Sequence, residues 1–117
     1  MRRLRHLFLL AGLVLIAATA CRNGEKEAAE AGLKSNLHAL RQLIQQYRED
    51  QGGFPPTLTV LVELGYVRRV PYDPLTRRND TWIETLESGT ANASFGIVDV
   101  HSGASGTALD GSKYVDW

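Results

Sequence analysis

The chain has 117 residues, a formal net charge of zero, 44% hydrophobic residues and 22% charged residues. A chain of this length can form one small domain only. Residues 21–117 carry ten basic and 13 acidic side chains. Such an acidic balance argues against a nucleic-acid-binding protein, because that class usually carries a clustered basic face.

The first 20 residues have the pattern of an export signal. Arg2, Arg3 and Arg5 precede an apolar run over Leu7–Ala20. A basic start followed by a run of this length is typical of a secretory signal peptide, and a bilayer span usually needs about 20 apolar residues. We therefore interpret residues 1–20 as a signal peptide or an N-terminal membrane anchor.

Cys21 is the only cysteine, and it follows Ala18, Thr19 and Ala20. This arrangement resembles the bacterial lipobox, in which the cysteine becomes the acylated first residue of a lipoprotein. We predict lipidation at Cys21, a tether over residues 21–24 and attachment to the membrane through the lipid. The alternatives are a plain signal peptide cut near Ala20 and an uncleaved anchor.

Residues Glu25–Gln51 are predicted to form one amphipathic helix. Its apolar residues recur at steps of three and four and form a single stripe: Ala29, Leu33, Leu37, Leu40, Ile44 and Tyr47, widened by Leu43. Glu25, Glu27 and Glu30 are expected in the first turns, where the helix dipole favours negative charge. The helix should end at Gly52–Gly53, before Pro55–Pro56.

A second, short helix is predicted over Thr57–Leu64, with Thr57 as its N-cap and Gly65 as its C-cap. Leu58, Leu61 and Val62 would point inward. Val70–Pro74 should be extended, because each proline disfavours helix in the residue before it.

This region resembles the globular region of the G-type (major) pseudopilin of type II secretion. The resemblance is carried by Leu40, Tyr47, Gly53–Phe54–Pro55, Leu58, Leu61, Gly65–Tyr66, Pro71 and Asp73–Pro74. It implies a pilin-like domain over residues 25–117 and a non-catalytic role in protein secretion through contacts with other secretion-system or pseudopilin subunits. It also implies a location at the periplasmic face of the bacterial cell envelope.

The apolar run departs from that family. Pilin-like proteins usually carry a glutamate five residues after a peptidase site, whereas the run here contains no acidic residue and its only glycine is Gly12. Two interpretations are therefore open. One is a secretion pseudopilin, and the other is a stand-alone envelope lipoprotein that uses a pilin-like domain as a binding module.

Three short strands are predicted in the last part of the chain: Thr81–Leu86, Phe95–Val100 and Lys113–Trp117. Glu87–Ser94 would connect the first two as a hairpin, and Phe95 and Ile97 would share a face opposite Val98 and Val100. The predicted fold class is α+β, with the long N-terminal helix packed on a small three-stranded antiparallel sheet, as in pilin-like proteins.

The loop from His101 to Ser112 is rich in glycine, hydroxyl groups and backbone oxygens. In G-type pseudopilins the equivalent loop binds calcium, and the resemblance implies Ser102, Asp110 and Ser112 as ligands, with Asp99 and Asp116 as further candidates. Calcium takes six to eight oxygen ligands. The alternative is a polar turn in which Asp110 bonds to its own backbone.

Asp99, His101 and Ser102 include the residue types of a hydrolase triad. Asp99 and His101 are two residues apart and Ser102 is adjacent to His101, and this proximity in sequence works against a hydrogen-bonded relay. His38 and His101 are too isolated for a zinc site. The sequence therefore predicts a protein that is not an enzyme.

Overall fold

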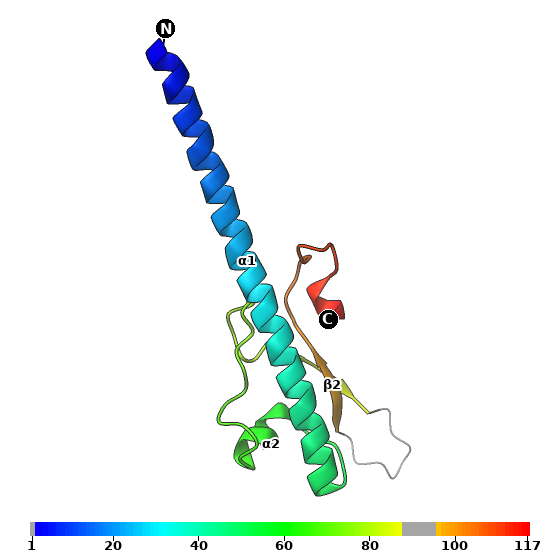
Figure 1. Cartoon of the computed structure of the whole chain (residues 1–117). Coiled ribbons are helices and arrows are strands. Elements are labelled where there is room, and N and C mark those ends of the chain that lie inside the picture. Colours follow the sequence, from blue (N-terminus) through cyan, green and yellow to red (C-terminus); the bar gives the residue numbers. More distant parts are fainter. Residues whose placement is uncertain (1, 88–95) are drawn as a thin grey trace.

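The computed structural model describes residues 2–87 and 96–117, with side chains from Asn23 onward. The element order is α1 (Arg2–Gln51), α2 (Leu58–Glu63), β1 (Ile83–Leu86), β2 (Ile97–His101) and a short 3₁₀ helix, η1 (Tyr114–Asp116). All other elements lie beside the C-terminal half of α1, and its N-terminal half extends away from them (Figure 1). The fold is α+β, as predicted.

Helix α1 is one continuous helix of 50 residues and begins well before the predicted Glu25. Glu25, Glu27 and Glu30 therefore lie inside the helix and not in its first turns. The prediction that they complement the helix dipole was wrong, because the helix continues through the predicted tether at residues 21–24. The predicted C-terminal end was correct: Gly52 has φ +79° and its amide bonds to the Arg48 carbonyl at 2.9 Å.

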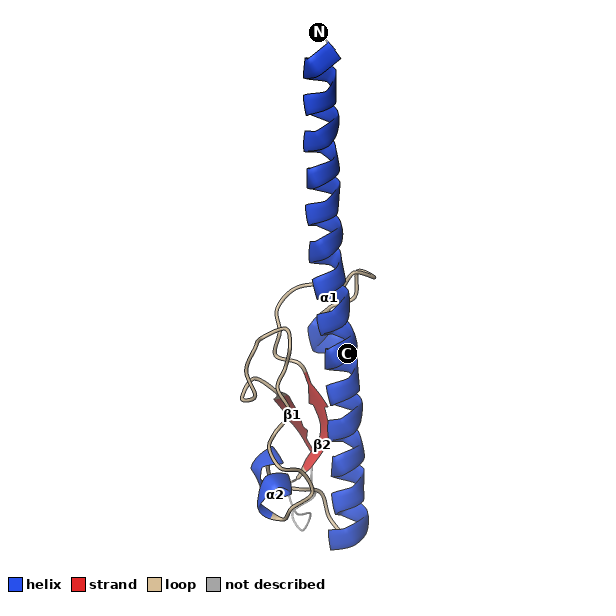
Figure 2. Ribbon diagram, turned by 60° about the vertical axis from the view of Figure 1, so that its left-hand side comes forward, coloured by secondary structure: helices blue, strands red, loops and turns tan. Residues whose placement is uncertain are grey.

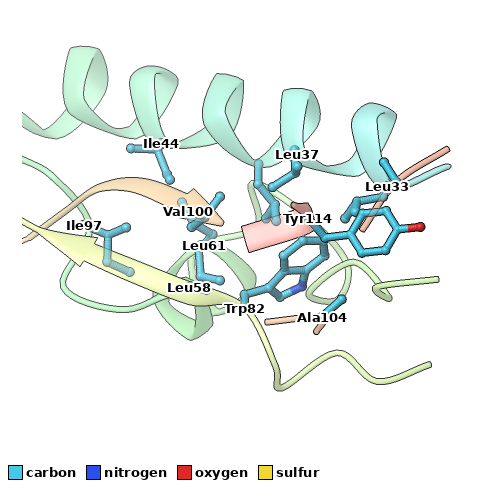
Figure 3. Close-up of a cluster of buried hydrophobic side chains, with 12 residues drawn as sticks. Leu33, Leu37, Ile44, Leu58, Leu61, Trp82, Ile97, Val100, Ala104 and Tyr114 are labelled. Carbon is cyan, nitrogen blue, oxygen red and sulfur yellow. The ribbon is translucent and has the colours of Figure 1, made fainter. Parts of the chain in front are cut away.

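The predicted apolar stripe of α1 is the spine of the core. Leu33, Leu37, Leu40 and Ile44 are each at most 2% exposed. They face the buried side chains of the later elements, which are Leu58, Leu61, Trp82, Ile97, Val100, Ala104, Ala108 and Tyr114. Figure 3 shows these side chains meeting in one layer beneath the helix. The amphipathic pattern of the sequence thus predicted the central packing surface.

Helix α2 has the predicted N-cap, Thr57, whereas its C-cap is Leu64, one residue before the predicted Gly65. The Thr57 hydroxyl accepts a hydrogen bond from the Val60 amide at 3.3 Å. At the other end the Gly65 amide bonds to the Val62 carbonyl, and the Tyr66 amide bonds to the Leu61 carbonyl. This pair of bonds is a Schellman motif, and Gly65 supplies the positive φ (+80°) that it requires.

The sheet has two antiparallel strands, β1 and β2, and α1 runs along β2 (Figure 2). A β-bulge interrupts the pairing: Thr85 pairs with Asp99 and Leu86 pairs with Ile97, which leaves Val98 as the extra residue. The bulge changes the alternation of side chains, so that Ile97 and Val100 are both fully buried. The predicted strict alternation over Phe95–Val100 was therefore wrong; Phe95 and most of the Glu87–Ser94 hairpin lie outside the described residues.

The third predicted strand, Lys113–Trp117, is wrong. Lys113 makes only an isolated bridge with Thr107, and Tyr114–Asp116 form η1. The Tyr114 ring is buried against the core and packs edge-to-face on Trp117, with ring centroids 5.2 Å apart. Bringing the Tyr114 and Trp117 rings together requires a turn at this point, because an extended strand would place side chains three residues apart on opposite faces.

Candidate functional site

The segment that carries the predicted site, residues 102–117, is attached to α1 through Glu30. One carboxylate oxygen of Glu30 accepts hydrogen bonds from the Leu109 amide at 2.9 Å and from the Tyr114 hydroxyl at 2.8 Å. Glu30 is only 8% exposed. The sequence analysis missed this contact, although Glu30 lies three residues before Leu33 and so occupies a position on the buried stripe.

Arg41 connects α1 to the last residues of the chain. Its Nε bonds to Asp99 Oδ1 at 2.8 Å, and its Nη2 bonds to the main-chain oxygens of Val100 and Trp117 at 3.0 and 2.8 Å. His101 Nδ1 lies 2.7 Å from the same Trp117 oxygen, and His101 Nε2 lies 3.4 Å from Asp99 Oδ2. Arg41 therefore fixes the C-terminal segment against the helix.

Asp99 responds to this environment. Partial burial opposes its ionisation, but hydrogen bonds from Arg41 and from the Val100 amide, together with the Arg41 charge, outweigh burial. The pKa of Asp99 therefore lies below its ordinary value. Asp99 is an ion-pair partner of Arg41, which is a role that the sequence did not predict.

Ser102, the first predicted calcium ligand, is fully buried. Its hydroxyl donates to Asp73 Oδ2 at 2.6 Å and accepts a hydrogen bond from the Ala104 amide at 3.1 Å. Among the described residues, no hydrogen bond joins Ser102 to Asp110 or Ser112. The Ser102 hydroxyl thus bonds to Asp73, whereas the calcium prediction requires it to bind the ion together with Asp110 and Ser112.

Asp110 and Ser112, the other two predicted ligands, lie together at the surface. Asp110 Oδ1 accepts hydrogen bonds from the Ser112 amide at 2.9 Å and from the Ser112 hydroxyl. These bonds, with the Lys34 charge as a smaller contribution, lower the pKa of Asp110. The arrangement is the polar turn of the alternative interpretation. Over residues 23–87 and 96–117, no group of three or more His, Cys, Asp or Glu side chains is arranged to hold a metal ion.

Calcium at Ser102, Asp110 and Ser112 stays a prediction. If it binds, calcium at a hundredfold excess over its dissociation constant should raise the free energy of unfolding by about 2.7 kcal/mol. Thermal unfolding with and without millimolar calcium measures this. Asp110→Asn, which keeps the size of the side chain and removes the charge, should abolish the shift, and an equal shift in this variant would contradict the site.

Tyr114 provides a pH-dependent test of the Glu30 contact. Burial, and then the hydrogen bond to Glu30 and its charge, raises the pKa of Tyr114 from 10.0 to about 12. The pKa of Tyr114 is higher in the folded protein than in the unfolded chain. The neutral Tyr114 hydroxyl therefore stabilises the fold fully below pH 10, and this stabilisation is lost as the pH rises to about 12. This difference in pKa corresponds to about 2 to 3 kcal/mol in the free energy of unfolding.

We therefore expect the free energy of unfolding, measured in urea, to fall steeply between pH 10 and pH 12. Tyr114→Phe removes the ionising group and should make this alkaline decrease much smaller. An unchanged decrease in Tyr114→Phe would mean that other groups cause it.

A groove lies beside this segment, along the face of α1 next to the buried stripe. It consists of two hollows, of about 410 and 350 Å³, which share His38 and Arg41. The first is lined by Lys34, Leu37, His38, Arg41, Asp110 and Trp117. The second continues along the helix past Gln42, Gln45, Gln46 and Glu49. The groove was not predicted from the sequence, because the wall formed by Trp117 comes from the far end of the chain.

Over residues 23–87 and 96–117, for which side chains are described, no helix combines the length and the apolar character of a membrane span. Comparisons with protein families, curated proteins and solved structures find no match for this chain.

Proposed function

We propose that this protein is a non-catalytic structural protein of the bacterial cell envelope, similar to the G-type pseudopilin of type II secretion, and that it acts in protein secretion through protein–protein contacts. The observation that carries the proposal is the form of the molecule. A 50-residue helix bears a small α+β domain on its C-terminal half, and its N-terminal half extends beyond that domain (Figure 1). A molecule of this form can make contacts with other proteins along the length of its helix.

The residues of the resemblance make the contacts that define the domain, which supports the proposal. The Tyr47 and Tyr66 rings lie 5.7 Å apart, and the Tyr66 hydroxyl donates to Asp50 at 2.8 Å. The Pro55 carbonyl accepts a hydrogen bond from the Ile97 amide at 2.8 Å, which ties the loop after α1 to β2. Asp73 is fully buried. These residues therefore contribute to the packing of the domain in this chain.

The environment of Ser102 supports a role without catalysis. A serine nucleophile needs a base within hydrogen-bond reach and access to a substrate. The Ser102 hydroxyl is buried and donates to Asp73, while His101 Nδ1 lies against the Trp117 main-chain oxygen. His101 Nε2 lies 3.4 Å from Asp99 Oδ2, but the Ser102 hydroxyl donates to Asp73 and not to His101.

We place the protein at the periplasmic face of the membrane, held by a lipid on Cys21. Mass spectrometry of the protein from its own cells should find acylated Cys21 as the first residue. A Cys21→Ser variant should lose the lipid mass and remain uncleaved. A methylated, unlipidated N-terminus would instead indicate processing as a pilin-like subunit.

The secretion role is tested by deleting the gene in the native bacterium and measuring the proteins released into the medium. We expect specific enzymes to disappear from the medium and to accumulate in the periplasm. Restoring the wild-type gene should reverse this. Unchanged secretion after deletion would contradict the proposed function.

A further inference from the structure

The groove along α1 has the length of a short extended peptide. It runs from Lys34 to Glu49, which is about 22 Å along the helix axis at the usual rise per residue. An extended chain of about six or seven residues covers this distance. The two hollows meet at His38 and Arg41, so one segment can occupy both.

One end of the groove carries three basic side chains, of which Arg41 is paired with Asp99, together with the Asp110 carboxylate and a fixed aromatic wall. Lys34, His38 and Arg41 follow each other at steps of four and three residues and so line one face of α1. The Lys34 ammonium lies 4.6 Å from the centroid of the Trp117 ring. Trp117 is itself held in place, because its Nε1 donates to the Ser112 hydroxyl at 2.8 Å. Aromatic and basic side chains of this kind dominate binding at protein interfaces.

Several hydrogen-bond donors at this end of the groove can bond to a ligand. Within the described part of the chain, Lys34 and His38 make no hydrogen bond or ion pair with a protein group. Arg41 uses Nε and Nη2 on Asp99 and main-chain oxygens, and no such bond involves its Nη1. A carboxylate that enters the groove could therefore accept hydrogen bonds from several N–H groups that do not already bond to a protein acceptor.

The other end of the groove is lined by amides. Gln42 and Gln45 each carry a donor and an acceptor, which match the N–H and C=O groups of an extended main chain. Gln46 lies beside them, and its Nε2 donates to Asp50 at 3.0 Å. Glu49 closes this end with a negative charge. The groove thus favours a segment that carries its acidic residues at one end only.

We propose that this groove binds an extended peptide segment of a partner protein, with carboxylates of the segment at Lys34, His38 and Arg41 and its main chain against the glutamines. The proposal rests on the proposed function, in which the protein acts through protein contacts. It adds the surface that is used and the chemistry of the partner.

The test uses the full-length protein and a fluorescently labelled, end-blocked hexapeptide of three glutamates followed by three serines. Binding is measured by fluorescence anisotropy at low salt with a chelator present. Lys34 is exposed, and Lys34→Glu should weaken binding about tenfold or more, because it places like charges together. Arg69→Glu makes the same charge change at an exposed position outside the groove and should leave the affinity within about twofold.

Asp110 gives a variant with the opposite sign. Its carboxylate lines the basic hollow and repels an acidic segment. Asp110→Asn should therefore bind the peptide several-fold more tightly. Circular dichroism and thermal unfolding of each variant show whether it is folded as the wild type.

Three outcomes would overturn the proposal: no binding of the peptide at millimolar concentration, equal weakening by Lys34→Glu and Arg69→Glu, or tighter binding of a thymidine hexanucleotide than of the peptide. The last would indicate a general polyanion surface. Failure here is separable from failure of the proposed function. Secretion that depends on the protein but is insensitive to Lys34→Glu overturns the groove alone, whereas peptide binding with unchanged secretion after deletion overturns the function alone.

Discussion

Replacing Ile44 by alanine is expected to lower the free energy of unfolding by about 2 to 5 kcal/mol. Ile44 is fully buried on α1 and belongs to the single core cluster formed by α1, α2 and the sheet. The substitution removes apolar surface from the core and leaves a cavity that the neighbours fill only partly. Since small domains are stable by about 5 to 15 kcal/mol, this loss removes a large part of the total stability.

The measurement is urea unfolding followed by circular dichroism. Gln45→Ala is the matched control, because Gln45 is the next residue on the same helix and is exposed. It should change stability by less than about 0.5 kcal/mol. Ile44→Val should lie between the two, at about 0.5 to 1.5 kcal/mol. An Ile44→Ala variant as stable as the Gln45→Ala variant would show that α1 does not pack on the sheet as described.

Asp73→Ala is expected to be the most damaging change outside the apolar core, with a cost of about 3 kcal/mol. Asp73 is fully buried, and its carboxylate accepts hydrogen bonds from the Ser102 hydroxyl at 2.6 Å, the Leu75 amide at 2.8 Å and the Thr76 amide at 3.4 Å. Alanine leaves these three donors without an acceptor. Each buried donor that is left unsatisfied costs about 1 to 3 kcal/mol, and relief from burying a charge offsets part of the sum.

The control is Asp80→Ala, the same substitution seven residues later. Asp80 forms an exposed ion pair with Arg78, and such pairs contribute little to stability. A double-mutant cycle of Asp73→Ala with Ser102→Ala should show coupling, since the two side chains share a bond. If Asp73→Ala were as mild as Asp80→Ala, Asp73 would not anchor the segment that contains Ser102.

The spacing of apolar residues was sufficient to identify the packing face of α1, because helical geometry places residues three and four apart on one side. The caps of α2 were equally local, since Thr57 and Gly65 act on groups within a few residues of themselves. The two strands could be located from their β-branched and aromatic residues, but the bulge at Val98 could not be located, because it depends on pairing with β1.

The candidate site was much less predictable. The turn of Asp110 and Ser112 is a contact over two residues and was foreseen as an alternative. By contrast, Ser102 is paired with a residue 29 positions away, and Glu30 holds Tyr114 across 84 positions. The resemblance implied a common ligand set for Ser102, Asp110 and Ser112, whereas folding gave Ser102 a buried partner of its own.

By itself, the sequence determined where α1 ends, where α2 begins and which side of α1 is buried, because these follow from backbone preferences and from periodicity over a few residues. The tertiary structure alone decided that Lys113–Trp117 is a turn, that Glu30 and Asp73 are buried acceptors, and that Trp117 forms a groove with Lys34 and Arg41. Those outcomes depend on residues that are far apart in the chain. A polar side chain such as Glu30, or an aromatic residue near the C-terminus such as Trp117, finds its partner only when folding brings the two within bonding distance.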